Sequence, residues 1–114
     1  MGTFNPSIAQ AWLLLVVAGL LETGWAVGMK ATQGFSRSGP TIAVLLAALL
    51  SFYLLALAMK ALPAGTAYAV WVGIGAVGAA ILGITVLGEP ASLPRVPSIL
   101  LIVAGVTGLR LFQG

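Results

Sequence analysis

The sequence predicts an all-α membrane protein with four transmembrane helices. Of its 114 residues 61% are hydrophobic and only 6% are charged, and the mean hydropathy is +1.16. The apolar residues form long stretches separated by short polar breaks. Because a soluble domain of this size needs charged residues near roughly a quarter of its total, the composition indicates an integral membrane protein.

The first predicted span covers residues 11–29 and ends at Lys30. A charge-poor stretch of this length is typical of a transmembrane helix. Residues 1–10 form a polar, uncharged N-terminal extension that lacks the positive start of a signal peptide. We therefore expect the first span to be retained as a helix.

Three further spans are predicted at residues 41–59, 66–87 and 98–112. Pro40 can open the second span, and the turn containing Pro63 and Gly65 separates it from the third. The fourth is short for a span and carries Arg110 near its end, where the side chain can reach the headgroups. Residues 11–112 are thus expected to form a single transmembrane domain without a soluble part.

The basic residues lie at or near the ends of the apolar stretches: Lys30, Arg37, Lys60, Arg95 and Arg110. They form no basic face, which argues against nucleic acid as a partner and favours contacts with the lipid interface. The sequence contains no cysteine and no histidine, so we expect no metal site and no cofactor.

The loop charges give little information on orientation in the membrane. With four spans, Lys30, Arg37 and Arg95 fall on one side, and Lys60 and Arg110 fall on the other. Lysine and arginine asymmetry normally sets topology, and here it is almost absent. Either other features fix one topology, or the chain inserts both ways and pairs as an antiparallel homodimer.

Glu22 is the strongest candidate for a functional residue. It lies in the middle of the first span, where an ionised carboxylate is costly, and intramembrane acids commonly mark ion or substrate pathways. The alternative is a permanently protonated side chain that bonds a neighbouring helix. Trp25 lies about one helical turn later, where it either offers an aromatic face to a cation or packs against lipid.

Polar and aromatic residues of the next two spans extend this candidate site. Ser51 is central in the second span, and its hydroxyl either bonds its own helix backbone or donates to Glu22. Tyr68 and Trp71 share a face of the third span, where they line a cation site or mark the membrane interface.

Glycines suggest where helices meet or bend. Gly73 and Gly75 allow close helix packing or form a hinge in the third span. Gly105 and Gly108 give the fourth span a small-residue face, which we interpret as a dimer seam. Glu89, in a turn near Arg95, is expected to be a solvated loop charge.

Three segments resemble the small multidrug resistance transporters. They are residues 12–30 around Leu20-Leu21-Glu22-Thr23-Gly24-Trp25, the loop segment Gly34-Phe35-Ser36-Arg37, and the string Leu62-Pro63-Ala64-Gly65-Thr66-Ala67-Tyr68-Ala69-Val70-Trp71-Val72-Gly73-Ile74-Gly75. The likeness covers nearly the whole chain past residue 10. Trp25 and the Gly88-Glu89-Pro90 turn are similar to the guanidinium-exporter subtype.

The resemblance implies an antiparallel, dual-topology homodimer in the bacterial inner membrane that exchanges protons for a cation. Glu22 would be the shared proton and substrate site, with Trp25 and Ser51 as its hydrogen-bonding partners. Tyr68 and Trp71 would line the pocket, and residues 73–75 would form the kink used in alternating access.

The expected function is therefore proton-coupled export of guanidinium or guanidinyl compounds, driven by the proton gradient and not by enzyme chemistry. Protons and cation would compete for Glu22. The alternatives are a quaternary ammonium or multidrug exporter of the same family and a small dual-topology channel.

Overall fold

The computed structural model describes residues 4–112, so the first three residues of the expected N-terminal extension and residues 113–114 lie outside it. It contains four α-helices: α1 (Ile8–Gly28), α2 (Ser38–Ala58), α3 (Ala64–Thr85) and α4 (Arg95–Leu111). A short 3-10 helix, η1 (Met29–Thr32), continues from α1. The prediction of an all-α protein with four helices is confirmed.

Each helix starts a few residues before the apolar stretch that predicted it. The first turn of α1 is stabilised by a capping box, in which the Ser7 side chain accepts from the Gln10 backbone and the Gln10 side chain accepts from the Ser7 backbone. As a result, α1 begins at Ile8, inside the expected extension. These helices have polar residues or proline at or next to their starts, which a search for apolar runs leaves outside the predicted spans.

Three helical segments are long and apolar enough to cross a membrane by length and composition: Ile8–Thr32, Ser38–Ala58 and Ala64–Thr85. Helix α4 has 17 residues, which corresponds to roughly 26 Å at about 1.5 Å per residue. That is slightly less than the hydrocarbon thickness of about 30 Å. Arg110 in its last turn is placed where it can extend the span to the interface.

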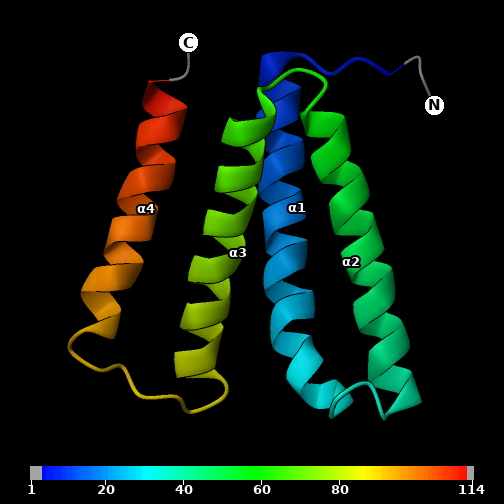
Figure 1. Ribbon diagram of the computed structural model, residues 1–114, viewed down its shortest axis with the longest axis vertical. Coiled ribbons are helices and arrows are strands. Elements are labelled where there is room, and N and C mark those ends of the chain that lie inside the picture. The colour runs from blue at the N-terminus through cyan, green and yellow to red at the C-terminus, as the bar shows by residue number, and fades with distance from the viewer. Residues whose placement is uncertain (1–3, 113–114) are drawn as a thin grey trace.

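The helices lie side by side in a single layer, in the order α4, α3, α1, α2 (Figure 1). The described chain measures 40 × 36 × 16 Å, so its smallest dimension is less than half of either of the others. Helix α1 packs against both α2 and α3, and α3 also packs against α4. Both broad faces of the layer are therefore free of further helices of this chain.

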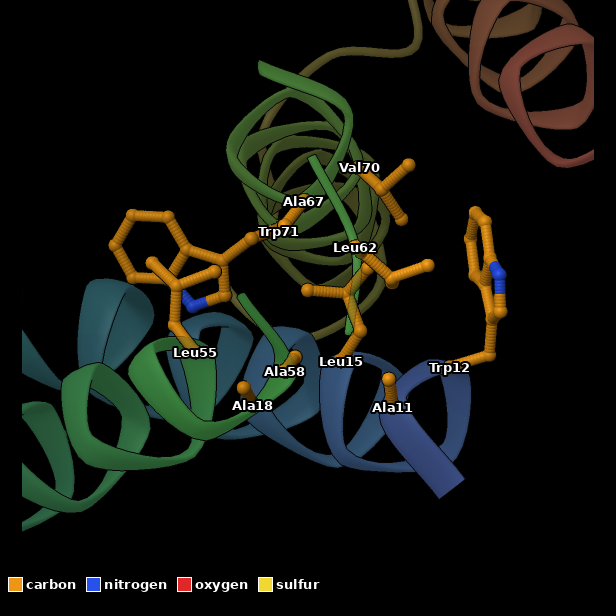
Figure 2. Packing of buried hydrophobic residues seen from close by; sticks show 10 residues of the cluster. All are labelled: Ala11, Trp12, Leu15, Ala18, Leu55, Ala58, Leu62, Ala67, Val70 and Trp71. Atoms are coloured by element: carbon orange, nitrogen blue, oxygen red, sulfur yellow. The ribbon is translucent and has the colours of Figure 1, made fainter. Parts of the chain in front are cut away.

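The core lies where α1, α2 and α3 meet, towards the start of α1 (Figure 2). Small residues there let the helix backbones approach closely. Arg110 of α4 reaches across to Trp12 of α1, with its guanidinium carbon 5.1 Å from the ring centre. The buried members of the core are Ala11, Trp12, Leu15, Ala18, Leu55, Ala58, Leu62, Ala67, Val70 and Trp71.

The connections segregate to the two ends of the layer (Figure 1). The α1–α2 and α3–α4 connections lie at one end, which we call the loop end and which carries Lys30, Arg37 and Arg95. The α2–α3 turn lies at the other end, together with the start of α1 and the end of α4. This arrangement matches the two sides inferred from the loop charges.

Candidate cation-binding site

Glu22 projects from α1 against α3, where Gly75 receives its carboxyl group. A Cβ atom built on Gly75 would lie 2.1 Å from Glu22 Oε1 and 2.3 Å from its carboxyl carbon. A methyl group at Gly75 would force the Glu22 carboxyl group to move. Gly75 is therefore the residue that lets α3 approach the acid, and the seam between α1 and α3 sets where the carboxyl group lies.

Two buried polar atoms on this part of α1 have no hydrogen-bond partner among residues 4–112. They are Glu22 Oε1 and Trp25 Nε1. Buried polar groups are nearly always paired, because an unpaired one costs free energy. The acceptor and the donor lie about one helical turn apart on α1. A proton or a polar ligand bound there could supply the missing hydrogen-bond partners.

The seam that holds Glu22 continues on both sides of it. Gly19 of α1 faces Ile74, since a Cβ on Gly19 would lie 2.6 Å from Ile74 Cγ2, and Thr23 occupies the space beside Gly78. Thr23 is buried and donates to the Gly19 carbonyl over 3.1 Å. Thr23 was not a candidate from the sequence, because its packing depends on a glycine 55 positions later in the chain.

Ser51 ties three helices together next to this seam. Its fully buried hydroxyl donates to the Ala18 carbonyl of α1 over 2.7 Å and accepts from Trp71 Nε1 of α3 over 2.9 Å. Ser51 thus bonds neither its own helix nor Glu22, and the two partners expected from sequence are corrected. It acts on Glu22 only through the backbone of α1, one turn earlier.

Four aromatic rings from three helices form a continuous row beside Ser51. Trp25 meets Phe52 edge to face at 6.0 Å, Phe52 meets Trp71 at 5.7 Å, and Trp71 meets Tyr68 at 5.6 Å between ring centres. Tyr68 is 55% exposed and Phe52 is 46% exposed. The row therefore presents aromatic surface to one open side of the layer, and its Trp25 member lies about one helical turn from Glu22 along α1.

Phe52 is the member of this row that sequence reasoning missed. It follows Ser51 directly and contacts both Trp25 and Trp71. The only available signal was an aromatic residue beside the central polar residue of the second span. Without knowledge of how α2 is rotated, that residue could equally well face lipid.

The glycines expected to form a hinge serve close packing in this structure. Gly75 faces Glu22, and Gly73 faces Val106 of α4, whose Cγ2 would lie 2.4 Å from a Cβ on Gly73. Helix α3 is continuous through both positions. A hinge motion at residues 73–75 therefore remains a prediction.

Helix α4 presents its small residues to open space. A Cβ built on Gly105 or Gly108 meets no described atom within 4 Å, and none of the described residues of α4 is buried. The expected dimer seam is thus unoccupied by other described parts of this chain. Its pairing with a second copy remains a prediction.

The fold and this site define a small multi-pass helical membrane protein with an unpaired carboxyl oxygen on α1 and a row of aromatic rings from three helices. The sequence model of the family described as Small Multidrug Resistance protein matches residues 10–102. The chain belongs to this family, as its resemblance indicated, and is a multi-pass protein of the bacterial inner membrane.

Relatives are similar over nearly their whole length. The protein named "Guanidinium exporter" of Yersinia pseudotuberculosis serotype I (strain IP32953) is 63% identical over 102 residues, which cover 90% of this chain and 98% of the relative. The protein of the same name from Escherichia coli (strain K12) is 59% identical over 102 residues, covering 90% and 97%. That of Salmonella typhimurium (strain LT2) gives the same identity and coverage.

Proposed function

We propose that this protein is a proton-coupled antiporter that exports guanidinium or small guanidinyl cations across the bacterial inner membrane. The observation that carries the proposal is the buried, unpartnered carboxyl oxygen of Glu22 beside a row of aromatic rings. The names of the relatives supply the class of substrate.

The chemistry of the site suits a guanidinium ion. Its planar N–H groups match a carboxylate in a bidentate fashion, and its flat faces stack on aromatic rings. Glu22 supplies the acceptor, while the exposed rings of Phe52 and Tyr68 supply aromatic surface on either side of the buried Trp71. Ser51 holds Trp71 through its hydrogen bond and fixes the spacing of the row.

Coupling follows from the cost of an uncompensated charge. An ionised carboxylate in the apolar layer is expensive unless it is paired. Glu22 therefore carries either a proton or a cation, and each neutralises it. If the protein exposes Glu22 alternately to the two sides of the membrane, and switches only when Glu22 is neutralised, then export of the cation is obligatorily coupled to uptake of protons.

A homodimer would complete the binding cavity. A layer one helix thick has no wall opposite Glu22, and its broad faces are largely apolar and exposed. A second copy supplies that wall and brings a second Glu22 into the same cavity. The near-equal basic charges at the two ends support an antiparallel, dual-topology arrangement.

The test is guanidinium-driven proton movement in proteoliposomes that contain the purified full-length protein. We expect the unaltered protein to exchange protons for guanidinium, and Glu22→Gln to abolish the exchange because its amide neither ionises nor pairs with a cation. Glu22→Asp keeps the carboxyl group and should retain measurable exchange. Tetramethylammonium, which lacks N–H donors, should drive weaker proton movement. Proton-coupled transport by the Glu22→Gln protein would refute the proposal.

A further inference from the structure

A second carboxylate lies at the loop end of the seam that holds Glu22. Glu22 and Ala26 share a face of α1, and Lys30 follows in η1. Along α3, Ala79 follows Gly75 in the same way. Ala26 and Ala79 line a cavity one turn beyond Glu22, and its other end is formed by Glu89 and Arg95.

This cavity, which we call the mouth, is large enough for a small planar cation. Its volume of about 310 Å³ corresponds to roughly ten water molecules at about 30 Å³ each. Its wall combines apolar residues of α1 and α3 with charged groups of the loop end. The residues that line it are Ala26, Val27, Lys30, Ala79, Ala80, Leu87, Glu89 and Arg95.

Glu89 is held in place by α3 and is not the freely solvated charge expected from sequence. Its backbone N–H donates to the Gly83 carbonyl over 3.0 Å. Its carboxylate lies so close to Gly83 that a Cβ there would be 2.3 Å from Glu89 Oε1. The side chain is only 35% exposed. The carboxylate is therefore prepositioned by the backbone.

The group that pairs with Glu89 is itself a guanidinium. Arg95 Nη2 lies 2.6 Å from Glu89 Oε1, and Arg95 Nη1 donates to the Pro90 carbonyl over 3.4 Å. Arg95 reaches this position on a long side chain from the first residue of α4. A partly exposed ion pair contributes little to stability, so exchange of one guanidinium for another is cheap.

On the basis of the proposed function, we propose that Glu89 is a docking site for the guanidinyl cation at the mouth. The cation takes the place of the Arg95 side chain on Glu89 before it reaches Glu22. Among the described residues that line the mouth, Glu89 is the acid and Lys30 and Arg95 are the cations. Without Glu89, the mouth would repel the substrate.

This assignment predicts opposite effects for the two partners of one ion pair. In proteoliposomes, Glu89→Gln should raise the guanidinium concentration at half-maximal proton exchange by roughly two- to fivefold, the range of a partly exposed charge pair. Arg95→Gln should lower it by a similar factor, because it removes the competing guanidinium. The maximal rate should change little in either protein, since Glu22 is untouched.

A merely structural ion pair would behave differently, because breaking it from either side would shift both variants in the same direction. Arg37→Gln is the matched charge control. Arg37 lies at the loop end but does not line the mouth, so the half-maximal concentration should stay unchanged. Circular dichroism of each variant verifies that the helices are formed.

The outcomes separate this inference from the proposed function. If the unaltered protein exchanges protons for guanidinium while both loop variants shift together, or neither shifts, the docking role of Glu89 is overturned alone. If the unaltered protein shows no guanidinium-driven exchange, the proposed function itself fails. Opposite shifts that also appear with tetramethylammonium as substrate would show a general charge effect and overturn docking through N–H donors.

Discussion

At the scale of single residues, the hydroxyl of Ser51 connects α2 to both α1 and α3. It donates to the backbone of α1 and accepts from the indole of Trp71, while remaining fully buried. The bond to Ala18 lies one turn before Glu22, and the bond to Trp71 lies within the aromatic row. A single side chain therefore sets the position of α1 relative to the rings that flank the carboxyl group.

We predict that Ser51→Ala destabilises the protein and loosens the aromatic row. The substitution leaves the buried indole N–H of Trp71 without its acceptor, at a cost of about 1–3 kcal/mol in the free energy of unfolding. Thermal unfolding in detergent, followed by circular dichroism, measures this loss. Ser98→Ala is the matched control, since that exposed hydroxyl bonds only the Pro94 carbonyl of its own turn. Equal stability of the two variants would contradict the role given to Ser51.

The site residues themselves were visible in the sequence, while several of their contacts were not. A lone acid in a charge-free run stands out because its desolvation is costly, which is why Glu22 was singled out. The partners of Ser51, the bridging position of Phe52 and the Glu89–Arg95 pair depend on how helices rotate against one another. Weak polar periodicity along uniformly apolar helices carries no such information.

At the scale of helices, the seam between α1 and α3 is a row of small residues opposite larger ones. Gly75 receives Glu22, Gly78 receives Thr23, and Gly19 receives Ile74. Such pairs let two backbones approach closely, which is the main source of helix association in lipid. The number and order of the helices were predictable because apolar runs must match the bilayer thickness. The seam was not predictable, because small residues occur on several faces of α3.

We predict that Gly75→Ala displaces the Glu22 carboxyl group and impairs guanidinium binding. The new methyl group would lie 2.1 Å from Glu22 Oε1, and overpacking of this kind typically costs about 1–3 kcal/mol. Quenching of tryptophan fluorescence by guanidinium measures binding, and thermal unfolding measures stability. Gly39→Ala in α2, where a Cβ meets no described atom within 4 Å, should lose neither. Wild-type binding by the Gly75→Ala protein would show that the seam does not position the acid.

At the scale of the whole molecule, the flatness of the chain is its main property. Four helices in one layer leave Glu22 and the aromatic row without an opposite wall. The exposed glycine face of α4 then offers a surface for a second copy. The sequence suggested the small-residue face through Gly105 and Gly108, but whether α4 turns that face away from α3 depended on packing.

We predict that Gly105→Leu disrupts the proposed homodimer. The Cβ atom of a leucine at this position meets no described atom of its own chain. The added side chain should therefore disturb the packing of the partner's helix. Size-exclusion chromatography with light scattering in mild detergent should show the mass of one chain instead of two. Gly39→Leu, at another open glycine, should stay dimeric. A dimeric Gly105→Leu protein would move the interface away from this face.

The peripheral place of α4 has a bearing on how such proteins diversify. Every residue assigned to cation binding at the centre of the layer sits on α1, α2 or α3, while α4 is attached through α3 and through the contact of Arg110 with Trp12. If α4 carries the dimer seam as proposed, substitutions on its exposed face would change which chain it pairs with, while the residues proposed to bind the cation on α1, α2 and α3 would stay the same.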